Sequence, residues 1–186
     1  MKSRDDAWTL LTTYTKEPHL IRHALAVEAA MRGAAQRLGE DVELWGATGL
    51  LHDFDYERYP TLEDHPVKGS EILRAEGYPE EMVVAILGHG NHSGVPRTTA
   101  MAHQLFAVDE LTGLVMAVAM VKGRDLAAVE PGSVMRKMKD KAFARGVSRQ
   151  DVTDGAAEIG EGLEAHIGHV IADLTEIAPA LGLAGA

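Results

Sequence analysis

The sequence predicts an all-α protein, and three features of the chain support that prediction. Apolar residues recur at helical spacing along most of the 186 residues, whereas the alternating pattern of β-strands is scarce. Proline and glycine stand where helices should begin and end, as Pro18 and Gly39 do around one long apolar stripe. Hydrophobic residues make up 46% of the chain, which at this length suits one domain, residues 1–186, with a real core.

The N-terminal part of the chain is expected to form three helices, over residues 4–14, 18–38 and 41–53. In the second helix, His23 lies three residues after Leu20 on the apolar stripe, so its side chain should point into the core. In the third helix, Gly49 weakens the helix intrinsically. Its expected use is the close approach of a neighbouring helix beneath His52 and Asp53.

The middle of the chain is expected to alternate loops and short helices. We expect a loop over residues 54–64, helices over 66–76 and 79–89, a loop over 90–97 and a long helix over 99–121. The His65-Pro66 bond sets one boundary, because a residue before proline avoids the α region while proline favours the first helical position. His65 should therefore stand at the entrance of one helix, and His89 at the end of the next.

The long helix over residues 99–121 is apolar enough to raise the question of a membrane span. Asp109 and Glu110 lie in its middle, however, and charges at a bilayer centre are costly, which favours a buried helix of a soluble protein. Asp109 has mostly apolar neighbours one turn away. Because burying an unpaired carboxylate is expensive, Asp109 needs a partner, and a cation is the simplest one.

The C-terminal part should contain a connection over residues 123–132, a basic helix over 134–145 and a final helix over 149–178 with a break near Gly160. The net charge is −10, which argues against general affinity for nucleic acid. Residues 122–149 nevertheless hold eight Lys or Arg against three acids, a net +5. Such a basic zone on an acidic protein suits a small phosphorylated ligand.

Cysteine is absent from the chain, so any metal must be held by histidine and carboxylate side chains. The N-terminal residues lack the apolar core of a signal peptide, which makes a cytoplasmic location the expectation.

One set of residues suggests the chemistry. The pair His52-Asp53 ends an apolar run, and the other members, in chain order, are His23, His65, His89, His92 and Asp109. This H…HD…D order resembles the HD-domain superfamily of metal-dependent phosphohydrolases over about residues 18–122. The stretch from His65 to Gly69 is similar to the H-P-x-x-G segment of the two-metal members, and His89 to their downstream histidine.

The resemblance implies an HD-like helical bundle with a metal site in its core, on which the helices over 131–178 pack. It implies that His23, His52, Asp53 and Asp109 hold a first metal, and that Asp53 bridges to a second held by His65 and His89. Asp53 and His89 are the implied catalytic residues. One or two divalent ions are expected, with Mn, Fe, Co, Ni, Mg and Zn indistinguishable. Such an ion lowers the pKa of a bound water to about 7 in favourable cases.

The expected substrate is a small phosphate ester, a nucleotide being one candidate, with Arg97, Lys137 and Lys141 as its expected binding residues. A nucleic-acid polymer or a membrane is not expected as a partner, while a homo-oligomer remains open. Some family members carry a lysine or glutamate just after the HD pair, where this chain has Asp55 and Glu57. His103, His166 and His169 are expected at the surface or on helix flanks.

Two alternative functions stay open. Some relatives of HD hydrolases use two irons to activate oxygen, and a set of six His and Asp ligands suits iron equally well. A ligand sensor that keeps a metal only for structure is the other alternative.

Overall fold

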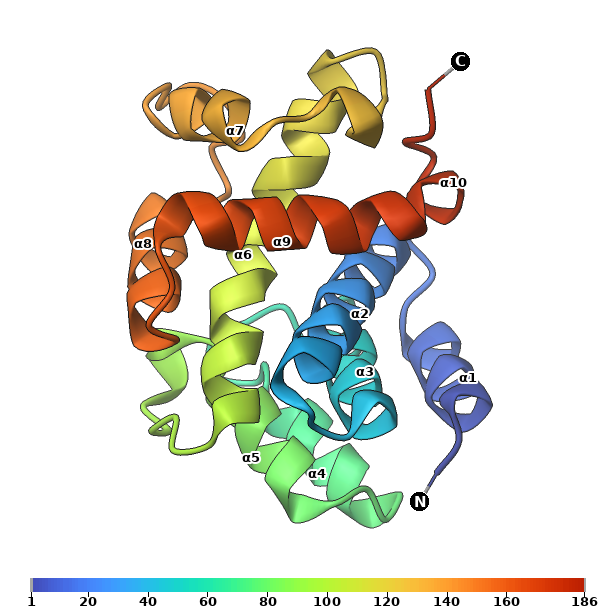
Figure 1. Ribbon diagram of the computed structural model, residues 1–186. Coiled ribbons are helices and arrows are strands. Elements are labelled where there is room, and N and C mark those ends of the chain that lie inside the picture. The colour runs from blue at the N-terminus through green and yellow to red at the C-terminus, as the bar shows by residue number, and fades with distance from the viewer. Residues whose placement is uncertain (1, 186) are drawn as a thin grey trace.

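Residues 2–185, which the computed structural model describes, form a wholly helical protein with no β-strand among them (Figure 1). The helices are α1 (Arg4–Tyr14), α2 (Pro18–Leu38), α3 (Val42–Leu51), α4 (Val67–Ala75), α5 (Glu80–Leu87), α6 (Ala100–Val121), α7 (Pro131–Met138), α8 (Arg149–Glu158), α9 (Leu163–Glu176) and α10 (Ala178–Leu181), with 3-10 turns at Asn91–Ser93 and Leu126–Ala128. The predicted all-α fold class is confirmed.

Helices α2, α3 and α6 form the centre of the molecule. Helix α2 packs along α3 and also against α6, and α9 crosses over both α2 and α6 (Figure 1). Their contact faces consist of fully buried apolar side chains such as Val27, Leu51 and Leu111. Helix α8 packs on the outer side of α6. The helices that carry the histidines are therefore held from both sides by apolar burial, the main favourable contribution to folding.

The predicted close approach at Gly49 is confirmed. A Cβ atom at this position would lie only 2.7 Å from the backbone carbonyl oxygen of Val27 on α2. Any larger residue would push α3 away from α2. Glycine at this position thus lets the end of α3, which carries His52 and Asp53, lie close beside α2.

A buried carboxylate ties the first three helices together. Glu28 on α2 is 5% exposed and accepts hydrogen bonds from Arg4 Nε of α1 at 2.6 Å and from Arg32 Nε at 3.0 Å. Arg32 also pairs with Glu43 at the start of α3. Two guanidinium groups thus compensate the cost of burying Glu28.

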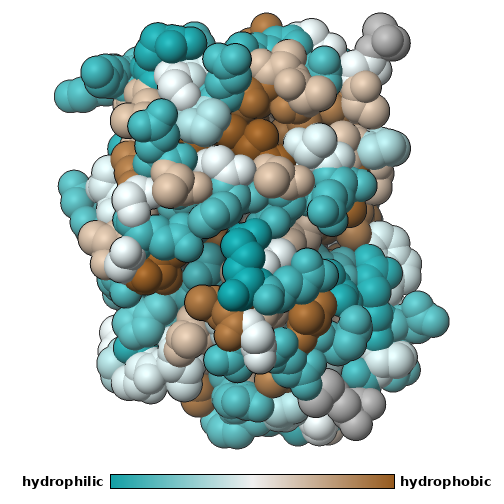
Figure 2. Space-filling model, viewed as in Figure 1, coloured by the Kyte–Doolittle hydropathy of each residue, from teal (hydrophilic) through white to brown (hydrophobic). Residues whose placement is uncertain are grey.

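Helix α6 is long and apolar enough to cross a membrane by length and composition alone. In this fold most of it is covered: Leu105, Leu111 and Val115 are fully buried against the neighbouring helices. The apolar character of α6 is therefore used in the core. Figure 2 shows that hydrophilic residues dominate the face in view, with only small brown patches between them.

Two predictions about the helices of the C-terminal part can be compared with the structure. The break near Gly160 is confirmed, because α8 ends at Glu158 and α9 begins at Leu163. The basic helix predicted over 134–145 is wrong in both bounds, since α7 spans Pro131–Met138 and turns follow it. The reason is Arg149, whose guanidinium donates to the carbonyl oxygens of Phe143, Ala144 and Val147 and so holds this segment in turns.

The expected surface location of His166 is wrong. Its side chain is 1% exposed on α9, and its Nε2 donates a hydrogen bond to the carbonyl oxygen of Ala107 on α6 at 2.9 Å. Burial lowers the pKa of His166. The sequence pattern missed this residue because a histidine that satisfies a buried carbonyl has no spacing signal of its own.

Candidate metal centre

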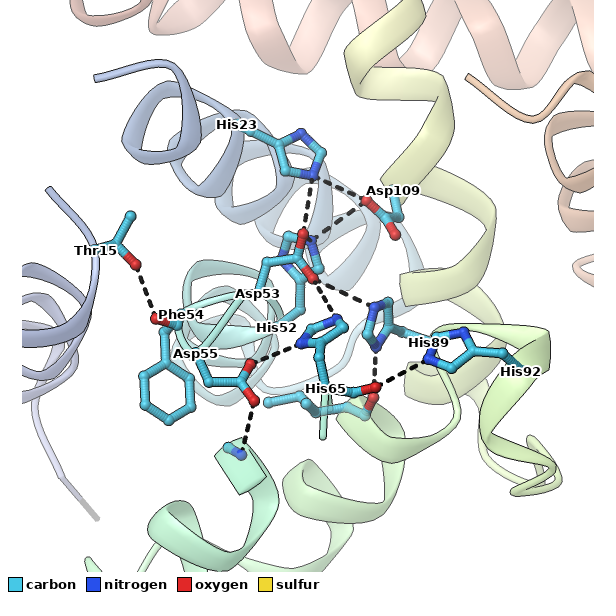
Figure 3. Close-up of polar contacts among 12 residues, drawn as sticks. Thr15, His23, His52, Asp53, Phe54, Asp55, His65, His89, His92 and Asp109 are labelled. Carbon is cyan, nitrogen blue, oxygen red and sulfur yellow. Dashed lines mark hydrogen bonds and ion pairs between the residues drawn. The ribbon is translucent and has the colours of Figure 1, made fainter. Parts of the chain in front are cut away.

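Six side chains from separate segments meet in one cluster beside α6 (Figure 3). The members, called the His/Asp cluster below, are His23 of α2, His52 and Asp53 after α3, His65 before α4, His89 after α5 and Asp109 of α6. These are the six residues that the sequence predicted as metal ligands. The structure brings all of them together across 86 residues of chain.

The cluster divides into two groups of three, each of which could hold a metal ion. One group is His23, His52 and Asp109, and the other is Asp53, His65 and His89. The ligand atoms within each group lie within 4.8 Å of one another. In the first group, Asp109 Oδ1 lies 3.0 Å from His23 Nε2 and 3.3 Å from His52 Nε2.

Asp53 lies between the two groups and presents one oxygen to each. Its Oδ1 lies 3.1 Å from His65 Nε2 and 3.4 Å from His89 Nε2. Its Oδ2 lies 3.5 Å from His52 Nε2 and 4.0 Å from His23 Nε2. A carboxylate in this position can bridge two cations. Figure 3 shows Asp53 between the histidines of the two groups.

Local backbone structure fixes the orientation of two imidazoles. His52 follows the end of α3 and His89 the end of α5, where the last carbonyl groups of a helix have no partner inside it. The Nδ1 of His52 donates to the Gly49 carbonyl oxygen at 2.8 Å, and that of His89 to the Ile86 carbonyl oxygen at 2.6 Å. Because Nδ1 is the donor to the carbonyl oxygen, each Nε2 faces the cluster, where its lone pair can bind a metal once any proton on it has been displaced.

Asp55 orients the third imidazole, a role that its position just after the HD pair did not indicate. It is 1% exposed and accepts hydrogen bonds from His65 Nδ1 and from the Gly69 backbone N–H, both at 2.8 Å. A Cβ at position 69 would lie 2.6 Å from the Asp55 carboxyl carbon. The H-P-x-x-G spacing therefore places histidine and glycine around one carboxylate. The Asp-x-Asp pattern at residues 53–55 is the sequence feature that could have predicted this role of Asp55.

The donor set fits a divalent cation. His52 Nε2 and Asp53 Oδ1 are buried and have no hydrogen-bond partner among residues 2–185. Leaving such atoms unpaired is costly, and a cation held in each group would satisfy them. Imidazole and carboxylate together suit several first-row divalent metals. When bound, such a cation supplies Lewis acidity towards a phosphoryl oxygen and acidifies water.

Without metal, the cluster holds its charge as ion pairs. Burial opposes the charged form of His52, but Asp53 and Asp109 outweigh it and raise the pKa of His52 well above its usual value. Burial likewise opposes ionisation of Asp53, yet His52 and the other imidazoles hold its pKa well below the usual range. Burial is also outweighed at His65, where the nearby carboxylates of Asp53 and Asp55 raise the pKa to about 9. A metal must displace these protons to bind.

The remaining candidates lie outside the two groups. His92 is exposed, and its Nε2 lies 3.1 Å from the His65 carbonyl oxygen, to which it donates. Arg97 pairs with Glu158 at 2.7 Å, Lys137 lies 3.7 Å from Asp140, and Lys141 is exposed. None of these three cations lines the cavity above the cluster. The geometry therefore gives no support to their predicted role in binding substrate.

The His/Asp cluster opens on a cavity of about 830 Å³. His23, Asp53, His65, His89 and Asp109 all contribute to its lining. A small molecule in this cavity would therefore contact the cluster directly.

Comparison with known proteins agrees with this geometry. The family model described as HD domain matches residues 20–120, more than half of the chain. The protein therefore belongs to the HD domain family. The helical fold and the His and Asp residues of the site agree with this family.

Two curated relatives are both named Ribonuclease Y. The protein from Lawsonia intracellularis is 33% identical over 103 residues, which cover 55% of this chain and 19% of the relative. The protein from Desulfotalea psychrophila is 31% identical over 96 residues, covering 51% and 18%. The match thus spans about a fifth of the length of these relatives. No solved structure matches the chain significantly.

Proposed function

We propose that this protein is a metal-dependent phosphohydrolase that uses water to cleave a small phosphate ester. The observation that carries the proposal is the position of Asp53, whose two carboxylate oxygens face separate groups of possible ligands. Two-metal sites of this kind clamp the attacking and leaving oxygens of an in-line displacement at phosphorus. Membership in the HD domain family supports the same chemistry.

In this proposal the chain's own residues hold the cations in place, and none of them attacks the phosphorus atom. His23, His52 and Asp109 would hold one divalent cation, and Asp53, His65 and His89 the other. The hydrogen bonds from Nδ1 of His52, His65 and His89 keep the three Nε2 atoms aimed inward without rearrangement. Such preorganisation lowers the cost of stabilising charge when the ester is cleaved. A side-chain nucleophile is not required.

The relatives named Ribonuclease Y make RNA one substrate to be tested. A cytoplasmic location and a homo-oligomer stay predictions. The donor set also suits iron, so oxygen consumption belongs in the same experiment.

The test is a metal analysis combined with a substrate panel on matched proteins. The purified chain is stripped of metal, reloaded with Mn, Fe, Co, Ni, Mg or Zn, and assayed with phosphomonoesters, nucleotides and a short RNA. Asp53→Ala serves as the inactive variant. His103→Ala is the matched control, because His103 is a partly exposed histidine paired with Glu158 and lies outside the cavity.

We expect metal-dependent phosphate release by the unmodified chain and by His103→Ala, and none by Asp53→Ala. Silence with every metal and every ester would reject the proposal. Iron-dependent oxygen consumption without phosphate release would replace it with the oxygenase alternative.

A further inference from the structure

The cavity above the His/Asp cluster has an unexpected charge distribution for a phosphate-binding protein. Among residues 2–185, those that line it include neither lysine nor arginine. Proteins that bind several phosphates or a nucleic-acid strand usually surround them with these side chains. Here, positive charge is available from the histidines of the cluster and any bound cation, and among the other lining residues from His19 and His92 alone.

Two nearby arginines are engaged elsewhere. Arg149 does not line the cavity, and its guanidinium donates to the carbonyl oxygens of Phe143, Ala144 and Val147. Arg97 donates to the Gly88 carbonyl oxygen at 3.0 Å and pairs with Glu158. These arginines shape the surroundings of the cavity, and neither is free to neutralise a ligand inside it.

The rest of the cavity wall is apolar and acidic. Leu20 of α2, Phe106 and Met116 of α6, and Val147 supply apolar surface. Glu110 on α6 and Asp151 on α8 add two carboxyl groups beyond those of the cluster.

Each of these two carboxyl groups is held by one hydrogen bond. Glu110 accepts from the Ser148 backbone N–H at 3.0 Å, and Asp151 from the Asn91 side chain at 3.1 Å. Each carboxyl group retains capacity to accept from a ligand. A second anionic group on the ligand would meet these acids, and no lysine or arginine.

Building on the proposed phosphohydrolase function, we infer that the substrate is a monophosphate ester with an apolar body that carries no further negative charge. The single phosphate would lie at the His/Asp cluster, and the body against the apolar wall. A hydroxyl or amine on that body can donate to Glu110 or Asp151. The same wall disfavours polyanions such as nucleoside triphosphates and RNA strands.

Three esters that differ in one substituent test this inference on the Mn-loaded protein. They are phenyl phosphate, 4-carboxyphenyl phosphate and 4-(aminomethyl)phenyl phosphate. The carboxylated phenol is no poorer as a leaving group, so slower cleavage of its ester reports on the cavity. We expect kcat/KM to fall about tenfold or more with the added carboxylate, an effect in the range of one charge pair in a partly buried site. The aminomethyl ester should react at least as fast as phenyl phosphate.

A charge-reversing variant sharpens the test. Met116→Lys places a cation on the cavity wall and should remove most of the penalty for the carboxylated ester. Leu38→Lys is the matched control, since Leu38 is 57% exposed on α2, does not line this cavity and undergoes the same change of charge. The control should leave the penalty unchanged.

Binding gives a readout that does not need turnover. Calorimetric titration with phenylphosphonate and 4-carboxyphenylphosphonate should show the same preference for the uncharged body. If phenyl phosphate is cleaved but the carboxylated ester, a nucleoside triphosphate or RNA is preferred, the substrate inference is wrong while the hydrolase proposal stands. If no ester is cleaved with any metal, the proposed function fails and the substrate inference fails with it.

Discussion

The His/Asp cluster and the basic segment at residues 131–149 both gather charged groups, but they hold them in different ways. The cluster collects its side chains from five segments, and its histidines 52, 65 and 89 have their Nδ1 atoms fixed by hydrogen bonds. In the basic segment Lys141 is exposed, and Lys137 lies 3.7 Å from Asp140 and 4.6 Å from the centre of the Phe143 ring.

The sequence reveals more about the His/Asp cluster than about the basic segment. A buried carboxylate such as Asp109 must find a partner, so its place in an apolar stretch constrains where it lies. A run of surface lysines has no such requirement, because exposed ion pairs contribute little and solvent screens them. Its position in the chain therefore says little about what it binds.

The largest expected effect comes from the residue that links the two halves of the cluster. Asp53→Ala should abolish binding of at least one cation and lower kcat/KM by about 10³-fold or more, since metal ions supply several kcal/mol of transition-state stabilisation. Metal content by mass spectrometry and the metal-induced rise in Tm measure the loss directly. An Asp53→Ala protein that keeps two metals and full activity would contradict the bridging role.

The metal-free protein should lose stability at alkaline pH. The folded-state pKa of His65 is raised to about 9 from 6.5, so its contribution is fully present below pH 6.5 and is lost as pH rises through 9. That contribution is on the order of 3 kcal/mol. Urea unfolding in the presence of a chelator, between about pH 6 and pH 10, measures it.

Two histidine substitutions, one inside the cluster and one outside it, are the test and the control for this pH dependence. His65→Gln should make the alkaline decline shallower, with the raised pKa of His52 accounting for what remains, whereas His103→Gln should keep the full decline. An unchanged slope in His65→Gln would show that another group titrates in this range.

Asp55 should matter for the cluster without contacting the substrate. Asp55→Asn keeps the shape but weakens the hydrogen bond that orients His65, and outer partners of this kind typically change metal affinity or activity by about 10- to 100-fold. Gly69→Ala should act in the same direction, because the new methyl group would meet the Asp55 carboxylate. Metal titration of the chelator-treated proteins provides the measurement, and an unaltered affinity in both variants would remove Asp55 from the account.

The smallest effects are expected in the basic segment. Lys137→Ala and Lys141→Ala should each change kcat/KM by less than about twofold, because solvated charges away from a cavity contribute weakly. Steady-state kinetics on the best ester of the panel decides this. A large rise in KM would restore the substrate-binding role that the sequence suggested and would weaken the contrast between the two regions.

The sequence by itself determined the helical fold class and the identity of the six clustered residues. Helical periodicity and Pro and Gly at helix ends are local properties that do not depend on how helices cross, and the order H…HD…D identified the six residues through the family resemblance. Gly49 could be interpreted in the same way, since its missing side chain implied a close neighbour.

Only the tertiary structure decided how those residues work together. The division into two groups, the bridging position of Asp53 and the contact of Asp55 with both His65 and Gly69 depend on how α2, α3, α4 and α6 pack. The burial of His166 also depends on a long-range contact, with the backbone carbonyl of Ala107. The sequence shows which groups need partners. The packing of the helices determines which partners they meet, because the atoms in contact are far apart in sequence.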